Sequence, residues 1–146
     1  MTTIPLQLKT TITSATAATG VDISSGTYGF SSSTPPNELI KVCVYGLSEG
    51  DTAVIQIDDS VDSFSAFVTH RSWTIEGPVG ATSNQGDTES GEGAASAFFV
   101  NPVYFSVSWR DVPAIRWGVS SAALRVNVSS LTGSSLSLTY EAFFTY

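Results

Sequence analysis

Hydrophobic and polar residues alternate along several stretches of this chain, most regularly near its C-terminus. One side of that pattern carries Leu136, Leu138, Tyr140, Ala142, Phe144 and Tyr146. The intervening positions are Ser, Thr, Glu and Phe. Successive side chains of a β-strand face opposite sides, so a period of two predicts a strand with one buried face. Similar alternation over 103–110 and 123–129 predicts two more such strands.

Further short strands are expected along most of the chain, with turn residues between them. They span 4–12, 39–45, 52–57, 63–69, 72–76, 97–100 and 114–119, and the pattern is also compatible with a short strand over 26–31. No stretch keeps a helical period. About nine or ten strands at this spacing predict an all-β fold, namely an antiparallel β-sandwich of jelly-roll or immunoglobulin-like type. A closed barrel is the alternative.

The N-terminal part of the chain allows two interpretations. Ile4, Leu6 and Leu8 alternate with polar residues, which indicates either the first strand of the sandwich or an extended arm that pairs with the sheet edge of another subunit. A stretch rich in Ser, Thr, Ala and Gly follows and ends in Pro35 and Pro36, which predicts a loop. The predicted organisation is therefore 1–38 for the arm or first strand with its loop, and 39–146 for the sandwich domain.

Composition narrows the function class. Ser and Thr together number 40 of 146 residues, whereas charged residues make up only 13%. The net charge of −7 disfavours binding to nucleic acid and would complement a basic protein surface. No apolar run approaches the roughly 18 residues of a membrane helix, so we expect no membrane association.

Cellular location is suggested by the N-terminus and the single cysteine. The first residues lack a basic stretch followed by an apolar one, so we expect no signal peptide. Cys43 lies in an apolar run and is expected to be a buried thiol. A lone cysteine forms no intrachain disulfide and favours a reducing compartment or assembly inside a cell.

Few residues suit catalysis or metal binding. His70 is the only histidine, and since no nucleophile motif accompanies it, we interpret it as a surface residue at a strand end. Asp58, Asp59 and Asp62 have oxygen ligands suited to calcium but also the composition of a hairpin turn, which we favour. The remaining acids considered as a glycosidase pair are Glu76, Asp87, Glu89 and Glu92. Most of them fall in the Gly-rich stretch 77–93, which predicts a long mobile loop. We therefore expect no enzyme activity, no cofactor and no metal site.

Several apolar residues do not fit the expected core. Phe143 lies on the opposite face of the last strand, and Tyr45 and Phe67 fall outside the regular register. Apolar residues on both faces of a sheet indicate contacts with a subunit or partner. The candidate partner contacts are Ile4, Leu6, Leu8, Tyr45, Phe67 and Phe143.

As a whole, the chain resembles the small structural proteins of tailed bacteriophages, in particular capsid decoration (cement) proteins. The resemblance covers the general character of a small acidic β-sandwich with a long polar N-terminal segment, which begins Thr-Thr-Ile-Pro-Leu-Gln-Leu-Lys. It implies a virion protein made in the host cytoplasm that binds the outside of the capsid as a homotrimer and bridges subunits of the major capsid protein. The alternative is a carbohydrate- or receptor-binding β-sandwich module of a phage tail.

Overall fold

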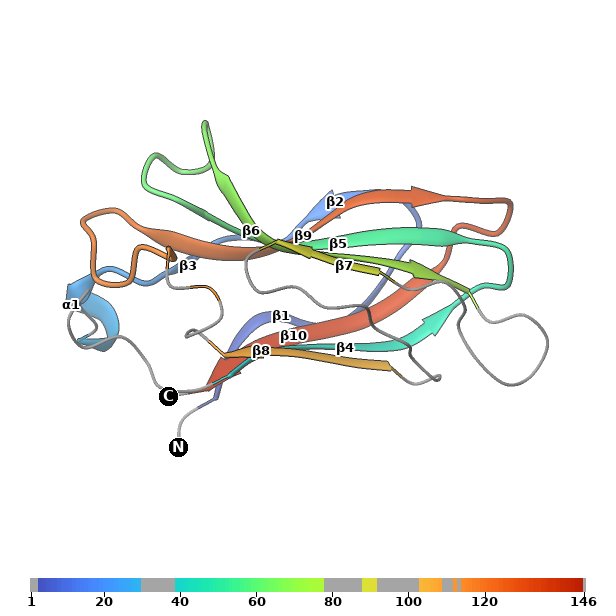
Figure 1. Cartoon of the computed structure of the whole chain (residues 1–146), viewed down its shortest axis with the longest axis horizontal. Coiled ribbons are helices and arrows are strands. Elements are labelled where there is room, and N and C mark those ends of the chain that lie inside the picture. The colour runs from blue at the N-terminus through green and yellow to red at the C-terminus, as the bar shows by residue number, and fades with distance from the viewer. Residues whose placement is uncertain are drawn as a thin grey trace.

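The fold consists of two antiparallel sheets packed face to face as a sandwich, with one short helix among the described residues (Figure 1). The computed structural model describes residues 3–29, 39–77, 88–91, 103–108, 112 and 114–145. The predicted all-β sandwich is thereby confirmed.

Four strands form one sheet, in the order β1-β10-β4-β8. Their bounds are Thr3–Ile12 for β1, Leu138–Thr145 for β10, Leu39–Leu47 for β4 and Val103–Ser108 for β8. All three pairings are antiparallel.

The second sheet has six strands, in the order β2-β9-β5-β6-β7, with β3 also paired to β9. Their bounds are Thr16–Ala17 for β2, Val21–Asp22 for β3, Thr52–Ser60 for β5, Val68–Glu76 for β6, Thr88–Gly91 for β7 and Ala123–Thr132 for β9. Helix α1 spans Ser25–Tyr28, where the pattern was compatible with a strand.

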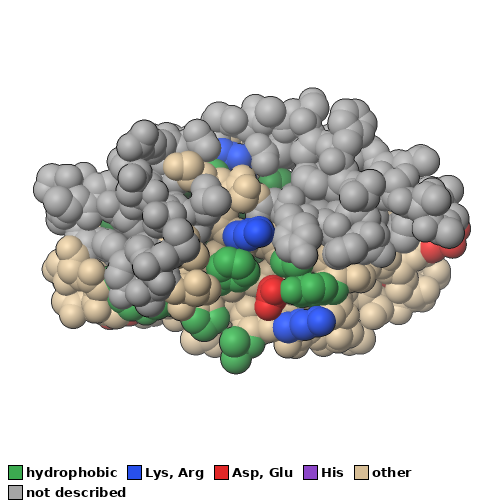
Figure 2. Space-filling view, turned by 90° about the horizontal axis from the view of Figure 1, so that it is seen from below, with side chains coloured by type: hydrophobic (Ala, Val, Ile, Leu, Met, Phe, Trp, Pro, Cys, Tyr) green, Lys and Arg blue, Asp and Glu red, His purple; other side chains and the backbone are tan. Residues whose placement is uncertain are grey.

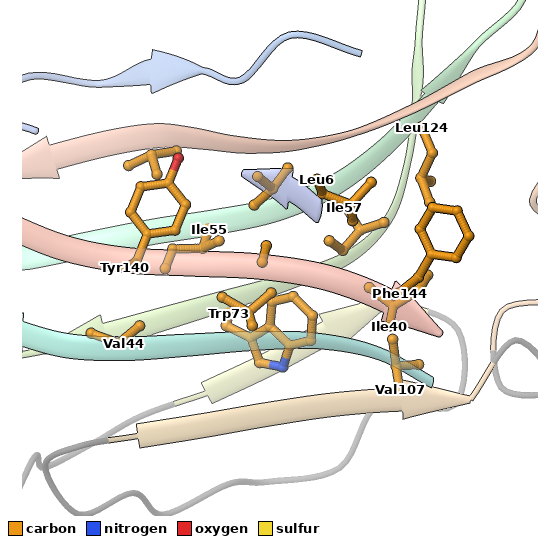
Figure 3. Close-up of a cluster of buried hydrophobic side chains, with 14 of the residues drawn as sticks. Leu6, Ile40, Val44, Ile55, Ile57, Trp73, Val107, Leu124, Tyr140 and Phe144 are labelled. Carbon is orange, nitrogen blue, oxygen red and sulfur yellow. The ribbon is translucent and has the colours of Figure 1, made fainter. Parts of the chain in front are cut away.

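The core fills the space between the two sheets, and the alternating positions supply it. In β10 every second residue from Leu138 to Phe144 is buried, as predicted. Trp73 from β6 lies between the sheets with aliphatic side chains from both (Figure 3). Cys43 is buried, which confirms the predicted buried thiol.

Three expected strands have different bounds or a different structure. Most of the expected strand 63–69 is wrong, because residues 61–67 form a loop. Only its last two residues are in a strand, and they continue through the expected strand 72–76 as β6. The stretch 114–119 forms turns instead of a strand, and it buries Ile115 and Trp117 at the end of the core. A chain reversal near a sheet end can bury alternate residues as a strand does, so periodicity alone does not separate the two cases.

The Gly-rich stretch 77–93 contains β7, which pairs with β6 from Thr88 opposite Thr74 to Gly91 opposite Arg71. This part is therefore strand rather than loop. The rest of that stretch after Gly77 lies outside the described residues, as do the expected strand 97–100, the Pro35-Pro36 loop and Tyr146.

The start of the chain is a strand of the protein's own sandwich. β1 pairs along β10 from Thr3 opposite Thr145 to Ile12 opposite Leu138. The register shifts on either side of Gln7, so two bulges interrupt the alternation. β1 forms one edge of the four-stranded sheet.

Candidate functional site

The outer face of the four-stranded sheet, turned away from the core, groups aromatic and charged side chains. Figure 2 looks onto this face and shows hydrophobic, basic and acidic side chains close together. We call the group formed by Lys9, Lys41, Tyr45, Glu141 and Phe143 the outer patch. Its members come from β1, β4 and β10, which are neighbours in the sheet.

The strand register explains why these residues meet. Phe143 lies opposite Lys41 on β4 and opposite Pro5 on β1, so these three side chains form one row across the sheet. In the neighbouring row, Glu141 lies opposite Cys43 on β4. Directly opposed residues on one face of an antiparallel sheet have neighbouring side chains, so Phe143 adjoins Lys41 and Pro5 on this face.

Tyr45 contacts two other members of the outer patch, Glu141 and Lys9. Its hydroxyl donates a hydrogen bond to Glu141 Oε1, and Lys9 Nζ lies 4.0 Å from the centre of its ring. A lysine ammonium over an aromatic face is attracted by the ring's electrons. The hydrogen bond to Glu141 raises the pKa of the Tyr45 phenol, so the phenol stays neutral and keeps donating over the physiological range.

The six candidate partner contacts lie in different parts of the structure. Tyr45 and Phe143 both lie on the outer face of the four-stranded sheet, where both are half-buried, and the row of Glu141 and Cys43 separates them. Leu8 lies on β1 at the neighbouring sheet edge and is 71% exposed. Phe67 lies in the loop of the other sheet and is 46% exposed.

The other two candidate contacts face the core. Leu6 is buried, with 4% of its surface exposed, and Ile4 packs against the core while half-buried. The prediction that Leu6 contacts a partner is therefore wrong, because its side chain is buried in this fold. The bulges in β1 are the reason, because they place Leu6 inside and turn Leu8 outward although both belong to one alternating set.

The free edge of β1 has several features that oppose pairing with another strand. Pro5 has no backbone N–H to donate. The Gln7 side chain donates a hydrogen bond to the backbone carbonyl oxygen of Leu8, at 2.8 Å. Bulges and prolines are common ways of protecting sheet edges. The expectation that this segment adds a strand to a neighbour's sheet is therefore not favoured by the geometry of the edge.

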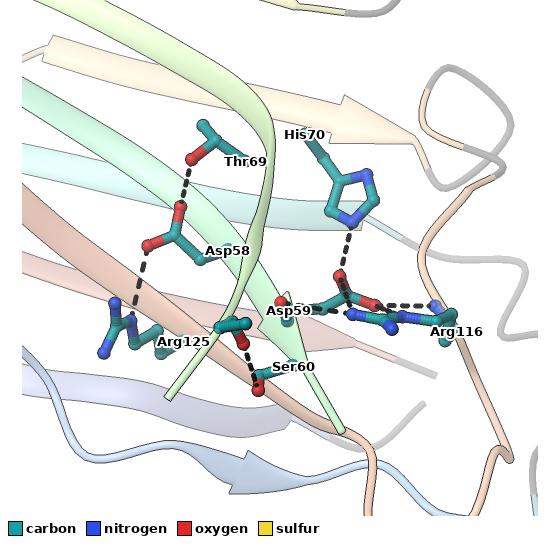
Figure 4. Close-up of polar contacts among 8 residues, drawn as sticks. Asp58, Asp59, Ser60, Thr69, His70, Arg116 and Arg125 are labelled. Carbon is teal, nitrogen blue, oxygen red and sulfur yellow. Dashed lines mark hydrogen bonds and ion pairs between the residues drawn. The ribbon is translucent and has the colours of Figure 1, made fainter. Parts of the chain in front are cut away.

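A second polar group joins buried Asp59 and His70 to the partly exposed Arg116 (Figure 4). The carboxylate of Asp59 lies 2.8 Å from His70 Nε2 and accepts hydrogen bonds from the backbone N–H and Nε of Arg116, at 3.0 and 3.1 Å. His70 is buried, so its interpretation as a surface residue is wrong. Asp59 itself is fully buried within β5, so the turn expected at this position is also wrong.

The pKa of Asp59 reflects two opposing influences. Burial, the largest single influence, raises the pKa, whereas hydrogen bonds from His70 and Arg116 lower it. The combined hydrogen bonds outweigh burial, and the pKa of Asp59 falls to about 2. The group holds the 114–118 segment against β5, which is a structural role.

Asp58 points to the opposite face of the six-stranded sheet. Its carboxylate accepts hydrogen bonds from Thr69 Oγ1 at 2.8 Å, Asn127 Nδ2 at 3.0 Å and Arg125 Nε at 3.3 Å. The Asp62 carboxylate instead accepts a hydrogen bond from the backbone N–H of Ala66, within the adjoining loop. The three acids considered for calcium are thus directed to different partners. Among the described residues, no three His, Cys, Asp or Glu side chains are grouped as metal ligands.

The loop over 61–67 is held in one conformation by Ser60. The Ser60 hydroxyl accepts hydrogen bonds from the backbone N–H of Asp62 and Phe64, and it lies 2.6 Å from the Ala66 carbonyl oxygen, to which it donates. Phe64 has a φ of 65°, an unusual backbone conformation for a bulky residue. The same loop places Phe67 over the guanidinium of Arg125, 4.7 Å from the ring centre.

Sequence reasoning did not select the charged members of the outer patch. Lys9, Lys41 and Glu141 each stand next to a selected apolar residue or at an outward position of a predicted strand. The signal that identifies these charged residues is their place in the alternating pattern, because they occupy positions that face outward. Which outward residues meet depends on strand order and register, which the pattern does not specify.

The described part of the chain contains no helix of a length and hydropathy suited to crossing a membrane. Comparison with family models, curated proteins and solved structures finds no match.

Proposed function

We propose that this protein is a virion structural protein that binds the outside of a phage capsid and stabilises it by bridging neighbouring capsid subunits. In this proposal the outer patch is the surface that docks on the major capsid protein. The resemblance in composition and architecture suggests the class of protein, and the outer patch is the observation that supports a docking role.

The outer patch has the composition of a protein contact surface. Tyr and Phe are enriched at the centres of interfaces, and amphipathic aromatic side chains contribute large contact areas. Tyr45 and Phe143 lie on adjacent strands of one sheet, which is a rigid support. Tyr45 is further oriented by its hydrogen bond to Glu141. Such preorganisation reduces the entropy lost on binding.

The direct test is co-sedimentation of the purified protein with expanded heads of the phage whose genome encodes it. We expect the parent protein to bind the heads at a fixed stoichiometry. The double variant Tyr45→Ala, Phe143→Ala should lose most of this binding, and the heads it fails to coat should break at a lower temperature. Its own fold should persist because both side chains lie on the outer face.

The matched control is Ser129→Ala with Thr132→Ala, which truncates two exposed side chains on β9 of the other sheet. It should bind heads like the parent. If the parent binds no heads, or if the outer-patch variant binds as well as the parent, the proposed function or its docking face is wrong.

Phe67 is the specific observation that favours the alternative, a carbohydrate- or receptor-binding module. The ring is exposed and lies beside the guanidinium of Arg125, so it offers a sugar both a flat apolar face and nearby hydrogen-bond donors. A glycan array with the parent and Phe67→Ala tests it. Binding to a defined glycan that the variant loses would support the alternative function.

A further inference from the structure

Uncharged polar side chains form a row on the outer face of the six-stranded sheet. Across β9, β5 and β6, Asn127 lies opposite Gln56, and Gln56 lies opposite Ser72. We call these three residues the polar row. All three are half-buried, and they stand on strands at the centre of the sheet. Side chains carried by strands are positioned more precisely than side chains on loops, so the row is a rigid surface.

The polar row adjoins an ion pair that is neutral as a unit. Arg125 lies opposite Asp58 in the next row of the same face, with its Nε 3.3 Å from Asp58 Oδ2. The rings of Phe64 and Phe67 lie on the guanidinium, with their centres 4.1 and 4.7 Å from its central carbon. Asp58 also accepts a hydrogen bond from Asn127 Nδ2 at 3.0 Å, which joins the ion pair to the row. The combined surface has no net charge on a chain whose net charge is −7.

This surface has unused capacity for hydrogen bonds. Several of its polar atoms have no hydrogen-bond partner among the described residues: Nε2 of Gln56, Oδ1 of Asn127, Oγ of Ser72 and the two terminal nitrogens of Arg125. The set contains donors and acceptors, because the amides supply both and a hydroxyl can act as either. A ligand can therefore exchange hydrogen bonds with this surface in both directions.

We infer that this surface binds a neutral glycan, an uncharged oligosaccharide whose hydroxyls exchange hydrogen bonds with the polar row and with the terminal nitrogens of Arg125. Sugar hydroxyls both donate and accept, which matches amide and hydroxyl side chains. The inference rests on the alternative function, glycan binding, and adds to it the binding face and the class of sugar. The outer patch belongs to the other sheet, so glycan binding does not compete with capsid docking.

Charge distinguishes neutral from acidic sugars at this surface. Its cation, Arg125, is already paired with Asp58, whose carboxylate would lie near the carboxylate of a bound uronic or sialic acid. Like charges placed together at a contact cost binding free energy and reject the wrong partner. The net charge of −7 adds repulsion at low ionic strength. A neutral sugar meets neither penalty.

The test uses the full-length protein and NMR chemical-shift titrations with defined oligosaccharides. The neutral panel consists of gluco-, manno-, galacto- and chito-oligosaccharides, and the acidic panel consists of oligogalacturonate and sialyllactose. We expect at least one neutral oligosaccharide to bind, with shifts centred on β5, β6 and β9. The acidic sugars should bind roughly tenfold more weakly or less.

Two double variants check the assignment to the polar row. Gln56→Ala with Ser72→Ala removes hydrogen-bonding groups from the row and should weaken binding of the neutral oligosaccharide roughly tenfold. Both side chains lie on the outer face, so the Tm of this variant should stay near that of the parent. The matched control, Thr11→Ala with Thr139→Ala, removes two hydroxyls that hydrogen-bond to each other on the four-stranded sheet. The control should bind the oligosaccharide like the parent.

The inference is overturned if no oligosaccharide binds, if an acidic one binds as tightly as the neutral ones, or if the polar-row variant binds like the parent. Binding that is lost in Phe67→Ala but kept in the polar-row variant would support the alternative function and contradict this binding face. Co-sedimentation with heads is a separate measurement, in which the polar-row variant should match the parent. A protein that coats heads but binds no oligosaccharide would leave the capsid role intact and contradict the neutral glycan.

Discussion

Asp59 illustrates how single polar residues are accommodated inside this sandwich. A buried carboxylate is costly unless hydrogen bonds replace its hydration. Here His70 and Arg116 supply those bonds. Since a carboxylate only accepts hydrogen bonds, His70 Nε2 carries the proton in this pair. Asp59 thereby connects β5, β6 and the 114–118 segment.

Asp59→Asn should destabilise the protein at neutral pH because the amide weakens both contacts. The folded pKa of about 2 lies below the unfolded value, so the charged form stabilises the fold above about pH 4. That contribution is lost as the pH falls towards 2, where Asp59 becomes protonated. Thermal unfolding of parent and variant should therefore show a difference in Tm at pH 7 that shrinks at pH 2 to 3. A difference independent of pH would contradict this role.

Val126→Asp tests the inward face of β9. Val126 is fully buried opposite Ile57, so the new carboxylate would lie in the core without a partner. We expect a loss of about 3 kcal/mol or more in the free energy of unfolding. Ser129→Asp, at an exposed position of the same strand, should change stability little. Equal denaturant midpoints for Val126→Asp and parent would show that the inward face is misassigned.

Among the strands, β1 owes the inward or outward direction of its leucine side chains to its bulges. Leu6→Ala should cost about 2–5 kcal/mol because it empties a buried site, as is usual for truncating a core leucine. Leu8→Ala truncates the same type of side chain at a position that is 71% exposed. It should leave the free energy of unfolding nearly unchanged. Denaturant unfolding of both variants measures the difference. Similar losses for the two would contradict the bulged register.

The turn between β9 and β10 depends on Gly133. Its φ is 137°, and a Cβ there would lie 2.2 Å from Asp51 Oδ1 and 2.8 Å from Asp51 Cα. Asp51 is buried and accepts hydrogen bonds from the backbone N–H of Ser135 and Ser137. Gly133→Ala should therefore cost about 2 kcal/mol or more, through both strain and the displaced aspartate.

Gly46→Ala is the control for this turn. No atom lies within 4 Å of its added Cβ, and its backbone needs no left-handed conformation. It should unfold at nearly the parent's temperature. A Gly133→Ala variant as stable as Gly46→Ala would show that Asp51 does not pack against this turn.

For the whole molecule, we expect self-association as a cyclic trimer, the oligomer that the resemblance to capsid decoration proteins implies. Apart from Leu8, the large hydrophobic side chains that are exposed in the described residues lie at one end of the sandwich: Val61, Phe67, Val68 and Val119. Exposed apolar groups that gather in this way commonly mark an interface, and closed cyclic symmetry covers them in every copy.

Size-exclusion chromatography with light scattering measures this association. The parent should be a trimer at tens of micromolar, and Phe67→Ser with Val68→Ser should shift it towards monomer. Tyr45→Ala with Phe143→Ala, in the outer patch, should leave the oligomer unchanged. A parent that stays monomeric would contradict self-association in solution.

The sequence by itself determined the fold class and most of the core. Alternation over residues 123–128 in β9 and along β10 identifies which of these residues face inward, because side-chain direction along a strand follows from backbone geometry alone. Tertiary structure decided the rest. A one-residue bulge reverses every later position, so the burial of Leu6 and the exposure of Leu8 could not be read from their spacing. The outer patch and the Asp59 group join residues far apart in the chain, and only strand order and register bring such residues within reach of one another.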